Sequence, residues 1–290
     1  MRNFKENLMQ VVFFISALAA VAAVALICLF LFANGFPAIR EIGFINFLFG
    51  EVWAPSREYY GILPFILGSI YVTAGAIVVG VPIGILSAIF MARFCPKKQY
   101  KLVKPAINLL AGIPSVVYGF FGLVVLVPLI MRLPFEMRSG QTMLAAAILL
   151  GIMILPTIVA VSESALRAVP DSYYEGALAL GASHERSVFF CVLPAAKSGI
   201  FAAVILGIGR AMGETMAVIM VSGNQPRMPQ GLLQGVRTMT ANIGLEMSYA
   251  QPGLHRDSLI ATGVVLFVFI LIINISFSLM KSRSDRRMEK

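Results

Sequence analysis

Long runs without a charged side chain divide the sequence. Asp, Glu, Lys and Arg are absent between Glu6 and Arg40, Glu58 and Arg93, Lys104 and Arg132, Arg138 and Glu163, and Asp257 and Lys281. Each run is longer than the ~20 apolar residues that an α-helix needs to cross a hydrocarbon core about 30 Å thick. The runs are continuously apolar rather than alternating, and lipid satisfies no free backbone groups. The pattern therefore predicts transmembrane helices.

A sixth apolar run contains two charged residues, Arg210 and Glu214. We therefore predict an all-α integral membrane protein with six transmembrane helices, near 8–33, 61–91, 107–131, 141–163, 198–221 and 259–280. The first run is longer than the apolar core of about 7–15 residues in a secretion signal. We expect it to remain as a permanent anchor.

Composition excludes the soluble classes. Hydrophobic residues make up 59% of the chain and charged residues 13%, and the mean hydropathy is +0.87. An ordinary globular protein is about one quarter charged, so the surface of this chain must also be apolar. Disordered, fibrous and disulfide-rich classes are excluded on the same grounds.

The net charge of +9 has a topological explanation. With six spans, most lysines and arginines fall on the side of the two termini, in the segments 1–7, 93–104, 167–197 and 281–290. The positive-inside rule then predicts cytoplasmic termini. Contact with anionic membrane lipid is expected. No basic face with interleaved aromatics appears, so nucleic-acid binding is not expected.

We divide the chain into a cytoplasmic N-terminus (1–7), a first helix with an external segment (8–60), a core of five helices (61–280) and a cytoplasmic basic tail (281–290). The external segment 34–58 is long enough to hold a short surface helix. Trp53, Tyr59 and Tyr60 lie just before the second span, where amphipathic aromatic side chains favour the membrane interface. The other long external segment, 222–258, is rich in Gly, Pro and Gln.

Arg210 and Glu214 are the first candidates for chemistry. An arginine at mid-span costs at least ~2.5–3.5 kcal/mol to insert, so it needs a partner or an aqueous path. Four residues separate the two, which predicts one helical face and an ion pair. One interpretation is a structural pair that locks helix packing. The other is a guanidinium that offers its two parallel N–H donors to a passing oxyanion. In this interpretation, the negative charge of Glu214 keeps the site from holding the anion too tightly for release. Gly207, Gly209 and Gly213 would permit close backbone approach.

A second candidate is the break predicted in the third span, at Gly112-Ile113-Pro114-Ser115. Proline removes a backbone donor and interrupts a helix. Ser115 and the freed carbonyls either line a path or mark a packing kink. We interpret Glu163 as a residue at the membrane boundary, and His184 and His255 as surface residues.

In the segment between the fourth and fifth spans, the residues indicate a short helix that lies outside the membrane. Pro170 and Asp171 suit a helix start. Gly181 suits a left-handed end.

This segment resembles the coupling loop of bacterial ABC importer permeases. The matching positions are Glu175, Ala177, Gly181, Leu193 and Pro194. Gly176 stands where that family usually has alanine, and Cys191 where it usually has isoleucine. The resemblance implies that the short helix docks on an ATP-hydrolysing subunit and transmits its closure.

Two further stretches resemble phosphate importer permeases of the PstC type: the segment 110–122, and Gly209-Arg210-Ala211-Met212-Gly213-Glu214-Thr215-Met216-Ala217-Val218. The resemblance implies a permease subunit in the bacterial inner membrane that moves inorganic phosphate into the cytoplasm. Together with the chemistry of these segments, it leads us to predict a substrate pathway at Arg210, Glu214, Thr215 and Ser115. The implied partners are two copies of a cytoplasmic ATP-binding subunit, a second permease of the PstA type and an extracytoplasmic phosphate-binding protein.

No Gly-x-x-x-x-Gly-Lys-Ser/Thr loop occurs in the sequence, so the chain is not expected to hydrolyse ATP. Cys28, Cys95 and Cys191 lack metal-type spacing. We predict no catalytic residues, metal or cofactor. Three alternatives remain: a permease for another oxyanion such as sulfate or molybdate, a proton-coupled secondary transporter that uses Glu214, and an intramembrane enzyme. The coupling loop argues against the second. The lack of converging acid, base or metal residues argues against the third.

Overall fold

The computed structural model describes residues 2–134 and 139–286. Residues 287–290 of the predicted basic tail lie outside the described residues. Four helices are long and apolar enough to cross a membrane, or up to six spans if each of two bent helix pairs counts as one. The first and last candidate spans are Leu8–Ile42, within α1 (Arg2–Ile42), and Leu254–Leu279, within α14 (Leu254–Arg286). The second, Leu63–Phe94, comprises α3 (Leu63–Ile89) and the π-helical turn Phe90–Phe94 that continues it. The third is the whole of α7 (Met143–Arg167). The prediction of an all-α membrane protein is confirmed, while the count of six stays a prediction.

The third predicted span is bent by 98° between α4 (Lys97–Gly112) and the stretch Ser115–Met131. That stretch comprises α5 (Ser115–Phe121), a π-helical turn (Gly122–Leu126) and α6 (Val127–Met131). Pro114 has no N–H to give to the carbonyl of Leu110, four residues earlier. The Tyr118 hydroxyl donates to that carbonyl instead, at 2.8 Å. The predicted interruption is therefore present, and the Leu110 carbonyl is satisfied by the Tyr118 hydroxyl and by the Ile113 amide, which donates to it at 3.4 Å.

The fifth predicted span is also broken. A bent helix pair occupies this region: α9 (His184–Ser187), a π-helical turn (Val188–Val192) and α10 (Leu193–Ala195) are followed after a bend of 69° by α11 (Lys197–Gly213), so the first half of the pair lies before the predicted start at residue 198. A second break separates α11 from α12 (Met216–Val221), because Glu214 has extended backbone angles. The prediction of one helix over 198–221 is therefore wrong.

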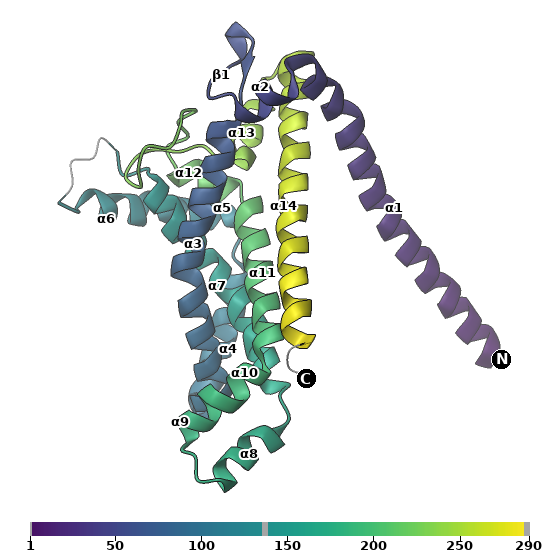
Figure 1. The fold of residues 1–290 in the computed structure, drawn as a ribbon, viewed down its shortest axis with the longest axis vertical. Helices are drawn as coiled ribbons and strands as arrows, with labels where there is room; N and C mark the ends of the chain where they lie inside the picture. Colours follow the sequence, from purple (N-terminus) through teal and green to yellow (C-terminus); the bar gives the residue numbers. More distant parts are fainter. Residues whose placement is uncertain (1, 135–138, 287–290) are drawn as a thin grey trace.

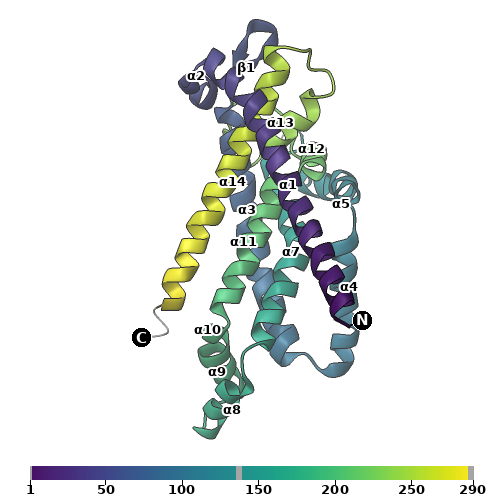
Figure 2. The same cartoon turned by 90° about the vertical axis from the view of Figure 1, so that its right-hand side faces the viewer.

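Helix α7 lies at the centre of the bundle, between α3 and α11 (Figures 1 and 2). Glycines let α3 approach it closely. A Cβ atom at Gly80 would stand 2.7 Å from the backbone oxygen of Gly151, and one at Gly75 would stand 2.6 Å from Ala147 Cβ. Both distances are below ordinary contact, so these glycines define the α3–α7 seam. Pro156 lies within α7 and removes one of its backbone hydrogen bonds.

One end of the bundle, which we call the hairpin end, carries α2 (Phe44–Phe49) and a two-stranded hairpin of β1 (Trp53–Ala54) and β2 (Tyr59–Tyr60). Between the strands lies a single 3₁₀ turn (Pro55–Arg57). The expected short helix in 34–58 is thus present as α2. The segment 222–258 also lies at this end, and part of it forms the helix α13 (Met239–Glu246).

Glu246 of α13 ties the hairpin end together. Its side chain, 7% exposed, accepts hydrogen bonds from Trp53 Nε1 at 2.9 Å and Arg237 Nη1 at 2.7 Å. His255 Nε2 lies 3.0 Å from the same carboxylate, and the His255 side chain is 18% exposed. The interpretation of His255 as a surface residue is therefore wrong, because a buried carboxylate holds it.

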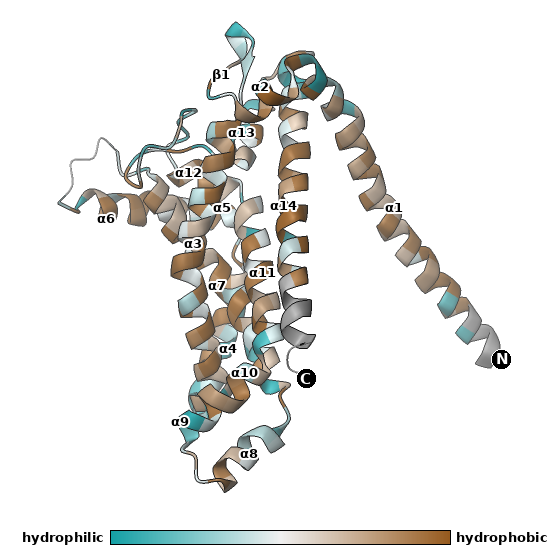
Figure 3. Ribbon diagram, in the orientation of Figure 1, coloured by the Kyte–Doolittle hydropathy of each residue, from teal (hydrophilic) through white to brown (hydrophobic). Residues whose placement is uncertain are grey.

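Helix α1 leans away from the bundle and packs against α14 near the hairpin end (Figure 1). None of its most apolar 18-residue window is buried within this chain. Figure 3 shows the same helix as largely hydrophobic along its length. An exposed apolar helix of this kind needs lipid or another membrane helix around it.

The opposite end, the α8 end, carries α8 (Asp171–Ala179) between α7 and α9. Gly181 has a φ of 83°. The amide of Ala182 bonds to the carbonyl of Ala177 at 3.1 Å, and that of Gly181 bonds to Leu178 at 2.9 Å. These two bonds form a Schellman motif. The predicted helix and its left-handed end are both present.

Candidate functional site

Arg210 lies in the last turn of α11 and is half-buried. Its Nη1 donates to the Thr157 hydroxyl of α7 at 3.1 Å. Within residues 2–134 and 139–286, no carboxylate forms an ion pair with Arg210. The predicted Arg210–Glu214 pair is therefore wrong. The cause is the helix break, because residues four apart share a face only while the helix continues.

Glu214 instead belongs to the break itself. One carboxylate oxygen accepts from the amide of Ala217 at 3.3 Å, in the first turn of α12. Its backbone carbonyl accepts from the hydroxyl of Thr240 at 2.9 Å. Thr240 is buried and comes from α13, far away in the sequence. A local cap and a long-range hydrogen bond therefore hold Glu214 in an extended conformation.

The other two predicted pathway residues, Ser115 and Thr215, lie at the two helix breaks. Ser115 is the first residue of α5, and Thr215 directly precedes α12. The Thr215 hydroxyl donates to the carbonyl of Gly213 at 3.4 Å. Both side chains are half-buried.

The two breaks adjoin because α5 and α12 pack side by side in the same direction. A Cβ at Gly119 would stand 3.0 Å from Ala217 Cα, and one at Gly122 would stand 2.7 Å from Val221 Cγ1. The contact positions increase in the same order along both helices, so the two helices run in parallel and the starts of α5 and α12 lie within about one helical turn of each other. The structure therefore brings the breaks that hold Ser115 and Glu214 next to each other.

The three glycines around Arg210 differ in their surroundings. A Cβ at Gly207 would stand 3.0 Å from Ile158 Cγ1 of α7. At Gly209 and Gly213, no atom of the described chain lies within 4 Å of such a Cβ. Close approach is thus present at Gly207, and the expectation is wrong for the other two within this chain.

The predicted coupling residues lie at the α8 end. Glu175 and Gly176 are exposed on α8, and Ala177 is buried. Leu193 and Pro194 lie further along, in α10, and line an apolar cavity beside α11. His184, expected on the surface, is half-buried: its Nδ1 lies 2.7 Å from the Tyr174 hydroxyl, and its ring centre lies 4.6 Å from that of Phe94.

Exposed apolar side chains accompany the coupling residues on α8. Leu180 is 91% exposed, Tyr173 is 54% exposed and Leu178 is 39% exposed. The helix therefore presents an apolar surface away from the bundle. It is held by Asp171, whose carboxylate lies 3.4 Å from Arg93 Nη1. Arg93 also donates to the carbonyl of Leu166 at 3.1 Å.

A buried carboxylate connects α4 and α7 next to this surface. Glu163 accepts from Lys104 Nζ at 2.6 Å, the Tyr100 hydroxyl at 2.7 Å and Arg167 Nε at 2.8 Å. Its side chain is 2% exposed. Three donors hold Glu163 inside the protein near the end of α7, and its interpretation as a residue at the membrane boundary stays a prediction. We call Tyr100, Lys104, Glu163 and Arg167 the Glu163 cluster.

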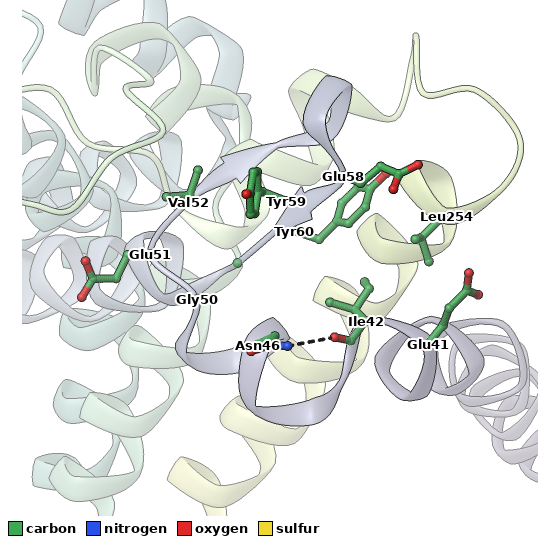
Figure 4. A pocket seen from close by; sticks show the side chains of 11 residues that line it. Glu41, Ile42, Asn46, Gly50, Glu51, Val52, Glu58, Tyr59, Tyr60 and Leu254 are labelled. Carbon is green, nitrogen blue, oxygen red and sulfur yellow. Dashed lines mark hydrogen bonds between the residues drawn. The ribbon is translucent and has the colours of Figure 1, made fainter.

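The cavity in Figure 4 belongs to the hairpin end and has a volume of about 610 Å³. Glu41, Glu51 and Glu58 line it, with Glu51 on the opposite side from Glu41. Burial, followed by the negative charge of Glu58, raises the pKa of the Tyr60 hydroxyl, which stays neutral. An acidic lining does not suit an anion, and no predicted pathway residue contributes to it.

Sequence reasoning missed Thr157 and Thr240. Both are ordinary helix threonines in the sequence, and only the fold brings them to Arg210 and Glu214. In the part of the chain that the structure describes, no group of three or more His, Cys, Asp or Glu side chains could hold a metal ion.

Comparison with known proteins gives one consistent family. A sequence model described as "Binding-protein-dependent transport system inner membrane component" matches residues 80–290. The chain is 40% identical over 266 residues to the probable ABC transporter permease protein YqgH of Bacillus subtilis, covering 89% of this chain and 86% of that protein. It is 36% identical over 275 residues to the phosphate transport system permease protein PstC of Mesorhizobium japonicum, covering 89% and 84%.

Among solved structures, the fold is similar to a chain of a bacterial alginate ABC transporter in complex with an alginate-bound periplasmic protein. The TM-score is 0.64 at 16% identity, over 92% of this chain and 94% of that chain. At this identity the likeness concerns the fold alone.

Proposed function

The chain belongs to the family of binding-protein-dependent transport system inner membrane components, and on this basis we propose that it is the permease subunit of an ATP-driven importer of inorganic phosphate. The relatives named PstC are phosphate transport permeases that match along most of their length. The chain itself supplies the path through the membrane, and the energy comes from a separate ATP-binding subunit.

One observation carries the choice of an anion. Arg210 uses Nη1 for Thr157, and its Nε–Nη2 edge meets no acceptor in the described part of the chain. That edge has the two parallel donors that recognise phosphate in a bidentate manner. The unpaired guanidinium stands close to two adjoining helix breaks, where backbone groups are free of helical bonds. Broken helices of this kind line substrate sites in membrane transporters.

The apolar surface of α8 supports the second part of the proposal. Leu180, Tyr173 and Leu178 are exposed outside the candidate spans, where water makes such exposure unfavourable. A cleft on a cytoplasmic ATP-binding subunit would cover them. Gly181 fixes the end of the helix, so α8 enters such a cleft at a defined angle.

The remaining partners follow from this arrangement. We propose two copies of the ATP-binding subunit, a second permease subunit of the PstA type and an extracytoplasmic phosphate-binding protein. The α8 end then faces the cytoplasm. The N-terminal end of α1 and the C-terminal end of α14 both point toward that end in Figures 1 and 2, which supports cytoplasmic termini.

Reconstitution tests the function directly. The chain is placed in liposomes with the ATP-binding subunit, the second permease and the binding protein, and uptake of radiolabelled phosphate, sulfate and molybdate is measured with and without ATP. We expect ATP-dependent uptake of phosphate alone. Uptake of sulfate or molybdate in its place would identify another oxyanion. Accumulation of phosphate by this chain alone, driven by a proton gradient without ATP, would contradict the proposal.

A further inference from the structure

Thr157 lacks a local hydrogen bond that three other hydroxyls inside long helices of the described chain make. Ser16, Thr262 and Ser276 each donate to the carbonyl four residues earlier, at 2.7–2.8 Å. This local bond is the usual one for a hydroxyl within a helix. Thr157 also lies within a helix, α7, yet among the described residues its one hydrogen bond is with Arg210.

Two buried neighbours on α7 flank this side chain. Pro156 precedes Thr157, and Ile158, which is 0% exposed, follows it and packs against Gly207 of α11. Gly207 precedes Arg210 by less than one helical turn, so the same contact brings the two helices together at this height. Thr157 is therefore held opposite Arg210 by the packing of its neighbours.

The bond has a directional consequence for the guanidinium. An arginine side chain carries five N–H donors in one plane. Fixing Nη1 on Thr157 restricts rotation of that plane and leaves the Nε–Nη2 edge for another acceptor. Because Thr157 accepts in this bond, its own hydroxyl proton is available as a further donor beside the guanidinium.

We propose that Thr157 is a positioning residue for anion transport, which orients the Arg210 guanidinium so that its Nε–Nη2 edge meets the anion. This inference rests on the proposed function. Arg210 touches the anion, and Thr157 acts through Arg210. Loss of the hydroxyl leaves the charge in place but frees the guanidinium to rotate, so the anion binds less often in the bidentate geometry.

The test uses the complete reconstituted transporter and inorganic phosphate. Thr157→Val removes the acceptor at nearly constant size, and Thr157→Ser retains it. Thr262→Val is the matched control, because it removes a hydroxyl from a helix without any link to Arg210. We expect the KM for phosphate to rise about tenfold in Thr157→Val, as loss of a hydrogen bond to a charged group implies. Thr157→Ser and Thr262→Val should keep the KM of the unchanged protein.

Subunit yield and the maximal transport rate are measured for each variant. A normal KM in an assembled Thr157→Val complex would overturn the inference. Should that variant assemble poorly, Thr157→Ala tests the same loss without a branched side chain, and a normal KM there has the same meaning. If the unchanged complex takes up sulfate or molybdate rather than phosphate, the proposed substrate fails, and the same variants measured with the transported anion still decide the role of Thr157.

Discussion

Lys104 Nζ lies 2.6 Å from Glu163 Oε2, and this ion pair joins α4 to α7 at a carboxylate that is almost fully buried. No residue of α4 is itself buried, and the Lys104 side chain is 29% exposed. The Glu163 cluster is therefore the main polar attachment of the first half of the broken third span.

The first prediction concerns this pair. Lys104→Met leaves Glu163 buried with two donors instead of three, which should lower the free energy of unfolding by about 1–3 kcal/mol. Adding Glu163→Leu removes the buried carboxylate that has lost this donor and should restore much of the loss, because Arg167 is 46% exposed and can be solvated by water. Thermal unfolding of the purified complex in detergent measures both. A double variant less stable than Lys104→Met alone would argue against a buried, charge-dependent attachment.

The second prediction concerns the end of α8. Gly181 has a φ of 83°, which strains a β-branched residue by about 1–3 kcal/mol. Gly181→Val should tilt α8 and reduce co-purification of the ATP-binding subunit, with normal membrane insertion. Gly176→Ala is the control, since a Cβ there meets nothing within 4 Å in the described chain. Full ATPase recruitment and uptake by Gly181→Val would remove α8 from its coupling role.

The third prediction concerns Arg210. Arg210→Gln should abolish phosphate uptake, because the glutamine side-chain amide has neither the positive charge nor the two parallel N–H donors of the guanidinium. Arg210→Lys should restore it in part, since an ammonium keeps the charge without bidentate geometry. Uptake and subunit yield are measured together. Full transport by an assembled Arg210→Gln complex would show that this arginine does not handle the substrate.

The fourth prediction separates two roles of Glu214. Its carboxylate accepts from the Ala217 amide, and a glutamine carbonyl accepts the same bond. Glu214→Gln should therefore assemble normally. If the negative charge assists release of the anion, the assembled variant should transport phosphate more slowly at saturating concentration. Loss of subunit yield would instead assign Glu214 a structural role.

The sequence predicts the apolar elements well, for a physical reason. Charge-free runs longer than a bilayer have few alternatives to a helix, so α1, α3, α7 and α14 follow directly. Pro114 also predicts the break before α5, because the missing N–H is a local property. Gly181 predicts the end of α8 in the same way.

The second break could not be read from local residues. No proline lies between α11 and α12, and Glu214 is held there by Thr240, which reaches its carbonyl from 26 positions further along the chain. Tertiary contacts of this kind override a local helical preference. The same applies to Glu163, whose α4 partners Tyr100 and Lys104 lie 63 and 59 positions away. Contacts at such separation leave no periodic signal.

Pro156 lies between two sets of contacts along α7. Above it, Ala147 and Gly151 belong to the rigid seam with α3. Below it, Thr157 and Glu163 are six positions apart, about 9 Å along the axis, in one uninterrupted segment. The close packing with α3 continues past the proline, because a Cβ at Gly84 would stand 2.7 Å from Ile158 Cγ2. Thr157, which holds Arg210, and Glu163, which holds α4, therefore lie on one packed stretch of a single helix, so a change at either contact acts on the same element.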